Sequence, residues 1–418
     1  MTNRRNRLLG ENQQFTSSGS AGNSTGSVLA NILTGSWRAL AETHHTSEED
    51  LSLVAPQLYQ SGAAALAWWR IQNSTLAKTA IGTLLHDAYR HLKLAARIHE
   101  REIKLVVKLF RSAGIEPVLV KGWAIARLYP DSALRPYGDI DLCVAPAQFL
   151  NAEAVLEGLA NTEGHFVDLH DGFTKLTASQ RWRGPTARVS DRMHDGTRIW
   201  DELYERSQLV DFDGQNIRVL SDEDHLRVLC VHLLRSGGWR PLWLCDVAIL
   251  LESRKPDFDW DICLTIDRRQ ADWIACTIGL AHHLLGVEVE DTPVTERAKH
   301  LPRWLVPAVL RQWDRCRNSH AAGTALPTLL SVLTEPKSLL AELYARWDNP
   351  VRSTTSLRGR FNDWPRWPYQ LCELIKHSPE LPRQLSLMIR EGLWKRTRPS
   401  DLVPLEFAPS KSYSIADF

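Results

Sequence analysis

Two aspartates stand one residue apart, at positions 139 and 141, in the segment GDIDL. Aliphatic residues alternate with them, which predicts a buried strand over residues 139–144. Successive side chains of a strand point to opposite faces, so both carboxylates are expected on one face. A buried carboxylate is costly unless it is paired or holds a metal ion. We therefore expect Asp139 and Asp141 to bind divalent cations. Two carboxylates at an exposed strand end are the structural alternative.

The D-x-D pattern alone is weak evidence, because it recurs elsewhere in the chain. The pairs at 211/213, 257/259 and 259/261 lie beside Gly or Pro in polar surroundings, which is typical of solvated turns. The pair at 139/141 differs in its apolar context. Mg²⁺ favours one or two carboxylates together with water and phosphate oxygens. Two ions can stabilise both the attacking and the leaving oxygen of a phosphoryl transfer. The pattern therefore favours two Mg²⁺ ions and this kind of chemistry.

A third carboxylate lies in HFVDLH, at residues 165–170, which also has the pattern of a strand. Asp168 is expected beside the aspartate pair, as a third metal ligand or as the base that accepts a proton from an attacking hydroxyl. His170 shares the face of Asp168 by the same two-residue rule. A single histidine is more often structural, so His170 is a secondary candidate.

Donors for phosphate are predicted upstream of the aspartates. Lys121 and Gly122 stand between a short apolar strand, at residues 116–120, and a short helix, at 123–129. The start of a helix offers free N–H groups to an anion, and glycine lets the backbone approach closely. Arg135 precedes Asp139 by four residues in a loop rich in proline. It is expected either to contact phosphate or to form an ion pair within the loop, and the sequence does not decide between the two.

The stretch KGWAIARLYPDSALRPYGDIDLCV resembles a block of the uncharacterised nucleotidyltransferase family within the DNA polymerase β superfamily. The resemblance extends over LFRSAGIEPVLVKG upstream, and over FVDLH and LWLCDVAILLE downstream, so that it covers residues 75–255. It implies a nucleotidyltransferase fold and a Mg²⁺-dependent transfer of a nucleoside monophosphate from an NTP, with release of pyrophosphate. It also implies an acidic triad of Asp139, Asp141 and Asp168.

The chain departs from the wider superfamily at Trp123, where serine or glycine is usual, and in the longer gap between Gly122 and Asp139. Both departures concern the triphosphate site and leave the metal-binding aspartates of the pattern in place. His232 and Asp246 fall in segments similar to the family in the helical half. Each is a secondary candidate for the far wall of the cleft, and a buried hydrogen bond between the two is the alternative.

The predicted elements indicate an α+β fold. Residues 74–112 have the strongest helical pattern, residues 146–159 and a segment near 198–207 are predicted helices, and QLVDFDGQNIRVL is a predicted hairpin. The pattern is helical from Ser221 onward, including helices at about 267–285, 303–316, 325–346 and 379–395. The predicted organisation is a disordered tail (1–27), a helical lead-in (28–99), a nucleotidyltransferase α/β domain (100–220), a helical C-terminal region (221–400) and an irregular tail (401–418).

Composition limits the function classes. The chain has 418 residues and a formal net charge of +1, so charge gives no global argument for a large nucleic-acid partner. Seven cysteines, none in a CxxC pair, and no long apolar run predict a reduced, cytoplasmic protein without a membrane partner. We expect an NTP substrate and a hydroxyl acceptor, with a small molecule or peptide favoured over RNA. The alternatives are a catalytically lapsed nucleotide-binding protein and a toxin-like tRNA nucleotidyltransferase.

Overall fold

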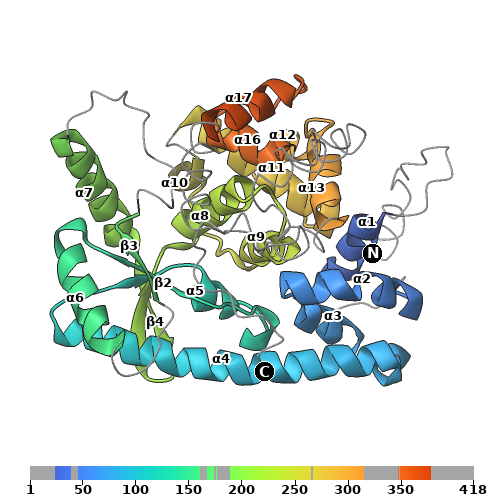
Figure 1. Ribbon diagram of the computed structural model, residues 1–418, viewed down its shortest axis with the longest axis horizontal. Coiled ribbons are helices and arrows are strands. Elements are labelled where there is room, and N and C mark those ends of the chain that lie inside the picture. The colour runs from blue at the N-terminus through green and yellow to red at the C-terminus, as the bar shows by residue number, and fades with distance from the viewer. Residues whose placement is uncertain are drawn as a thin grey trace, which may run out of the picture.

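The computed structural model describes residues 24–38, 46–160, 167–173, 176, 189–264, 267–314, 347 and 349–377. Within these residues the fold is a mixed α+β arrangement, as predicted, with one five-stranded sheet and many helices (Figure 1). The expected helices at 325–346 and 379–395, and most of both predicted tails, lie outside the described residues.

The sheet contains β1 (Val118–Leu119), β2 (Ile140–Val144), β3 (Val167–Asp171), β4 (Gln208–Phe212) and β5 (Gln215–Val219) in the order β3-β2-β1-β5-β4. Strand β2 is antiparallel to β1 and parallel to β3. The register between β2 and β3 pairs Asp141 with Asp168, and Cys143 with His170. The strands predicted from alternation are therefore present, and their order brings the acidic segments side by side.

The predicted hairpin joins β4 to β5 through Asp213 and Gly214. Both residues have positive φ, +46° and +80°, which is the conformation that a tight two-residue hairpin turn requires. Asp and Gly tolerate this conformation better than other residues, so the sequence signal and the observed turn agree.

The two faces of the sheet are covered differently. Ile140, Leu142 and Val144 of β2 pack in one apolar cluster with α4 (Ala80–Ser112) and α6 (Phe149–Ala160). Cys143 belongs to a second cluster, with α7 (Val189–Arg206) and α8 (Asp222–Arg235). Asp141 alternates with the first set, so it lies on the face turned toward α7 and α8.

Helix α4 is the longest described element, and it runs along one edge of the molecule beneath the sheet and the N-terminal helices (Figure 1). Thr79 caps its first turn by accepting from the Gly82 N–H, and Gly114 follows its end with φ +73°. The helix continues without a break through residues 99 and 100, where the sequence placed a boundary. The domain limits themselves stay predictions.

The remaining helices build the largest apolar cluster. It joins the N-terminal helices to those that follow the sheet. Besides residues of α4 and α8, it includes residues of α1 (Thr25–Leu33), α2 (Glu48–Ser61), α3 (Ala64–Ile71), α9 (Pro241–Ser253), α10 (Trp260–Leu264), α11 (Arg268–Leu285), α12 (Thr295–Lys299), α13 (Leu305–Asp314) and α16 (Pro350–Ser356). Short elements complete the described chain: α5 (Gly122–Ala126), α17 (Trp367–His377), and the 3₁₀ turns η1 (Thr75–Lys78), η2 (Ser132–Leu134) and η3 (Pro146–Gln148).

None of the helices in the described part of the chain combines the length and the apolar character needed to cross a membrane.

Candidate active site

Asp141 is the centre of the polar site. It lies in the middle of β2 and is 4% exposed. Its Oδ1 atom accepts from the Lys121 ammonium at 2.8 Å and lies 3.1 Å from His170 Nε2. Burial pushes the pKa of Asp141 upward, but the Lys121 charge and the bonds from His170 and Lys121 outweigh it and lower the pKa to about 2. Asp141 is therefore ionised at neutral pH.

Strand β3 places two further candidate metal ligands, Asp168 and His170, beside Asp141. Asp168 is paired with Asp141 in register, and His170 Nε2 lies 3.4 Å from Asp168 Oδ2. One ligand atom from each of Asp141, Asp168 and His170 lies within 4.8 Å of the others. The side chain of Asp168 is 45% exposed, whereas that of His170 is 14% exposed. The cluster is thus buried at Asp141 and open to solvent at Asp168.

Asp139 stands immediately before β2, two residues from Asp141. Burial raises its pKa, and the neighbouring charges of Asp141 and Asp168 raise it further, while Lys121 acts in the opposite direction. A carboxyl destabilised in this way gains from a nearby cation. Asp139 is outside the set of three whose ligand atoms lie within 4.8 Å of one another, so the structure groups Asp141 with Asp168 and His170.

The donor set fits a divalent cation. Two carboxylates and an imidazole converge, and carboxylate oxygens are the ligands that Mg²⁺ and Mn²⁺ prefer. Burial and then the like charge of Asp141 raise the pKa of Asp139, and a bound cation would offset both effects. His170, ranked second from the sequence, is one of the three converging residues.

The turn between β1 and α5 has an unusual backbone. Lys121 has φ +52° and ψ −144°, and Gly122 follows with φ +41°. Positive φ is rare for a residue such as lysine and persists only where the surroundings hold it. The Lys121 N–H donates to Nε2 of His225 at 3.0 Å, and the side chain of Lys121 reaches Asp141. The turn is thus held by one contact of its backbone and one contact of the Lys121 side chain.

His225 was not singled out from the sequence. It lies on α8 and is 1% exposed, and its Nε2 must be unprotonated to accept from Lys121. Burial lowers its pKa to about 3, assisted by the charges of Arg127, Arg135 and Lys121. A histidine in a mostly apolar helix carries no signal of its partner, because Lys121 is 104 residues away in the chain.

Protonation of His225 gives a pH prediction. Its pKa is about 3 in the folded protein and 6.5 in an ordinary environment, so the unfolded chain binds the proton more tightly. The contribution of His225 to the free energy of unfolding should be fully present above pH 6.5. It should be lost as pH decreases from 6.5 toward 3. The expected slope is about 1.4 kcal/mol per pH unit for each such histidine. Urea unfolding of wild type and His225→Gln between pH 4.5 and 7.5 tests this. The Gln side chain can still accept from the Lys121 N–H, and the unfolding free energy of the variant should depend less steeply on pH than that of wild type. Equal slopes would contradict the lowered pKa of His225.

Gly122 gives a second prediction. A Cβ at this position would meet its nearest atoms, in Tyr137 and Asp139, at 3.6–3.7 Å, so space is not limiting. The positive φ alone should make Gly122→Ala destabilising, by about 1 kcal/mol. Gly138→Ala is the matched control, because a Cβ there meets nothing within 4 Å. Equal urea midpoints for the two variants would show that the φ of Gly122 is not constrained.

Arg135 and Asp246 form a buried ion pair. Arg135 Nε lies 3.1 Å from both carboxylate oxygens of Asp246, and Nη2 lies 2.8 Å from Oδ2. Tyr129 donates to Asp246 Oδ1 at 2.9 Å. Arg135 is 4% exposed and Asp246 0% exposed. Of the two expectations for Arg135, the structure shows the ion pair, although with helix α9 and not within the loop. Contact of Arg135 with phosphate stays a prediction.

His232 lies two turns after His225 on α8. Its ring meets Trp243 of α9 edge-on, with ring centroids 4.3 Å apart. Burial lowers its pKa to about 3, with a further contribution from Lys121. Asp246 bonds with Arg135 and Tyr129, and the contact of His232 with α9 is aromatic packing on Trp243. A role for His232 and Asp246 as a cleft wall stays a prediction.

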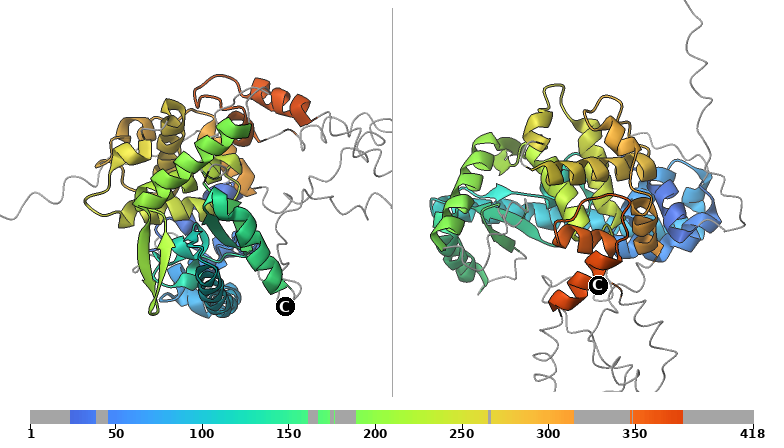
Figure 2. Two further views of the ribbon diagram at one scale, coloured as in Figure 1. Left: turned by 90° about the vertical axis from the view of Figure 1, so that its left-hand side faces the viewer. Right: turned by 90° about the horizontal axis from the view of Figure 1, so that it is seen from above.

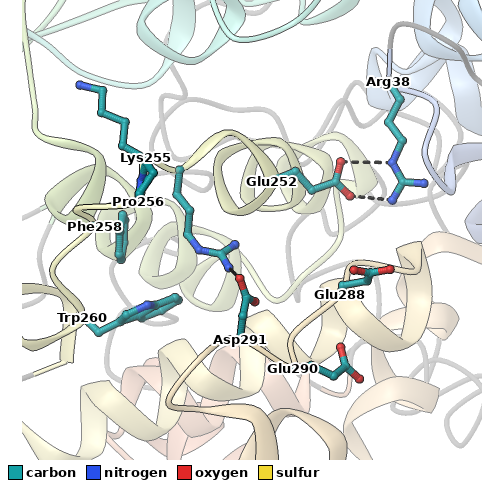
Figure 3. Close-up of a pocket in the computed structure, with 10 residues that line it drawn as sticks. Arg38, Glu252, Lys255, Pro256, Phe258, Trp260, Glu288, Glu290 and Asp291 are labelled. Atoms are coloured by element: carbon teal, nitrogen blue, oxygen red, sulfur yellow. Dashed lines mark hydrogen bonds and ion pairs between the residues drawn. The ribbon is translucent and has the colours of Figure 1, made fainter. Parts of the chain in front are cut away.

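A separate cavity of about 960 Å³ lies between the end of α9 and the loop after α11 (Figure 3). Its charged side chains are largely paired: Arg38 with Glu252, and Arg254 with Asp291. None of the candidate site residues lines it. We therefore do not place the chemistry there.

The sheet carries a buried aspartate on one strand and an acidic residue in register on the parallel neighbour, and a constrained Lys-Gly turn lies beside them. Such a donor set could hold a divalent cation. A family model described as "Uncharacterised nucleotidyltransferase" matches residues 47–286, and the chain belongs to this family. Membership agrees with the expectation from the sequence and extends the matched region at both ends. It assigns the general kind of reaction, nucleotidyl transfer. No curated protein and no solved structure matches the chain.

Proposed function

We propose that the protein is a Mg²⁺-dependent nucleotidyltransferase that moves a nucleoside monophosphate from an NTP to a hydroxyl acceptor and releases pyrophosphate. The observation that carries the proposal is the convergence of Asp141, Asp168 and His170 within 4.8 Å, next to Asp139. The family match supports the same general reaction.

The roles follow from burial and charge. Asp141 and Asp168 would hold the cations, with Asp139 beside them; the ions, when bound, neutralise charge on the phosphates and on the reacting oxygens. Lys121 places its ammonium 2.8 Å from Asp141, at the edge where phosphate oxygens would approach. Gly122 opens α5, whose first N–H groups add donors.

The transfer itself breaks one bond and forms one. The acceptor oxygen bonds to the α-phosphorus, and the bond from that phosphorus to the pyrophosphate oxygen breaks. The hydroxyl proton passes to a base, and Asp168 is the most exposed carboxylate of the cluster. The acceptor that we favour is a small molecule or a peptide, because the formal net charge of +1 offers no broad attraction for RNA.

Label transfer tests the reaction class. Each of the four NTPs, labelled in turn at the α- and at the γ-phosphate, is incubated with Mg²⁺, the protein and a cell extract. We expect α-label to appear on an acceptor and γ-label to appear in pyrophosphate. Transfer of γ-label to an acceptor would indicate a kinase. Binding of NTP without transfer of either label would favour the lapsed nucleotide-binding alternative.

A further inference from the structure

The outer face of helix α4 carries four exposed aliphatic side chains. Leu84, Leu94, Ile98 and Leu105 are 55%, 64%, 52% and 47% exposed. Seen nearly end on, α4 lies at the periphery of the molecule, with its far side away from the other helices (Figure 2). Single exposed leucines are ordinary, whereas an ordered row along one helix marks an interaction surface.

The spacing of these residues is that of a helix-packing seam. Leu84, Ile98 and Leu105 lie at multiples of seven residues, and Leu94 precedes Ile98 by four. In one heptad frame these are three a positions and one d position, and the other a and d positions from 84 to 108 hold Asp87, His91, Arg101 and Lys108, so the apolar row alternates with polar side chains. We call Leu84, Leu94, Ile98 and Leu105 the α4 seam. Helix α4 spans 33 residues, so the seam has the length of several turns.

Basic residues lie along and beside the seam, with one at every third or fourth position: Arg90, Lys93, Arg97, Arg101, Lys104 and Lys108. Four of these have acidic neighbours. Lys93 lies 2.7 Å from Asp131, Arg97 3.0 Å from Glu100, Lys104 2.8 Å from Asp213 and Arg90 4.0 Å from Asp87. Arg101 and Lys108 are exposed and have no carboxylate partner within the described ranges. The seam is therefore flanked by uncompensated positive charge.

This charge pattern disfavours a second copy of the chain as the occupant. An antiparallel pairing that stacks Leu94 on Ile98 of the other copy places Arg97 near Arg97 of that copy. A parallel pairing places Arg101 beside Arg101. Like charges brought together across an interface oppose association. The same charges favour an occupant that is acidic.

We propose that the outer face of α4 binds an acidic amphipathic helix of another protein. The apolar side chains of that helix would pack on Leu94, Ile98 and Leu105, and its carboxylates would pair with Arg101 and Lys108. The α4 seam supplies apolar contact and the basic row supplies orientation and specificity. This surface goes beyond nucleotidyl transfer and does not depend on it.

The probe is a synthetic four-heptad peptide with Leu at a and d and Glu at e and g, carrying a fluorophore. Its binding to the full chain is measured by anisotropy, beside a peptide in which every Glu is replaced by Lys. We expect the acidic peptide to bind at least about tenfold more tightly, a difference of about 1.4 kcal/mol. Added salt should weaken the binding.

Three variants locate the binding on α4. Leu94→Gln/Ile98→Gln should weaken the acidic peptide about tenfold. Arg101→Glu/Lys108→Glu should also weaken it and should strengthen the basic peptide. Leu150→Gln on α6, which removes a side chain that is 77% exposed elsewhere, should change neither.

Several outcomes would overturn the proposal. One is equal binding of the two peptides, or binding that is unchanged in both α4 variants. A second is a dimer in analytical ultracentrifugation that Leu94→Gln/Ile98→Gln disrupts, since the occupant is then a second copy. A third is flotation with phosphatidylserine vesicles that requires the same residues, since the surface then binds anionic lipid.

Discussion

Replacing Asp141 with Asn should lower kcat/KM for nucleotidyl transfer by about 1000-fold. Loss of an outer-shell partner of a metal typically costs about 10–100-fold, and loss of a ligand is expected to cost more. Asp141 is also the residue on which Lys121 and His170 converge, so the substitution removes the charge that both contact. Steady-state rates of pyrophosphate release over a range of Mg²⁺ concentrations check the prediction.

The matched control for this variant is Asp257→Asn. Asp257 belongs to another D-x-D pattern and is exposed. It should keep the wild-type rate. Circular dichroism melting of both variants establishes that they fold. A folded Asp141→Asn protein with more than about a tenth of wild-type activity would remove Asp141 from the catalytic centre.

Removing the charge of Arg135 should lower the free energy of unfolding more than any other substitution that we propose. Arg135→Ala removes the guanidinium partner of Asp246, which is 0% exposed, and leaves it the hydrogen bond from Tyr129. Breaking a buried ion pair from one side typically costs about 3–5 kcal/mol, because the other charge stays buried without compensation. Urea unfolding of the variant measures the free energy of unfolding directly.

A double variant separates stability from function. Arg135→Met/Asp246→Leu removes both charges and should be more stable than Arg135→Ala, since an apolar pair of similar size often replaces a buried ion pair at little cost. If Arg135 also contacts phosphate, the double variant stays folded but its KM for NTP rises. A double variant less stable than the single one would mean that the pair is not the main interaction at this site.

Much of the sheet follows from local signals. The alternation around Asp139 and Asp141 predicts β2, the pattern of HFVDLH predicts β3, and Asp213-Gly214 predicts the hairpin turn. These signals lie within a few residues of the feature that they specify. The capping of α8 by Ser221, which accepts from the Asp224 N–H, is an equally local contact.

The contacts that complete the site depend on residues far apart in the chain. Arg135 meets Asp246 across 111 positions and Lys121 meets His225 across 104. Neither pairing has a local signature, because a charged residue in a loop and a histidine in a helix each have many possible partners. His170 was placed second because a lone histidine is usually structural, and only the register of β3 against β2 shows that it faces Asp141.

The most direct test of the central claim is Mg²⁺-dependent pyrophosphate release from the four NTPs, with cell extract as the source of acceptor. Wild type is compared with the double variant Asp139→Ala/Asp141→Ala at matched concentration. We predict release from at least one NTP by wild type, and none above background by the variant or after chelation of Mg²⁺. Release that is equal in the two proteins, or absent in wild type together with absent NTP binding by calorimetry, would contradict a nucleotidyltransferase centre at these aspartates.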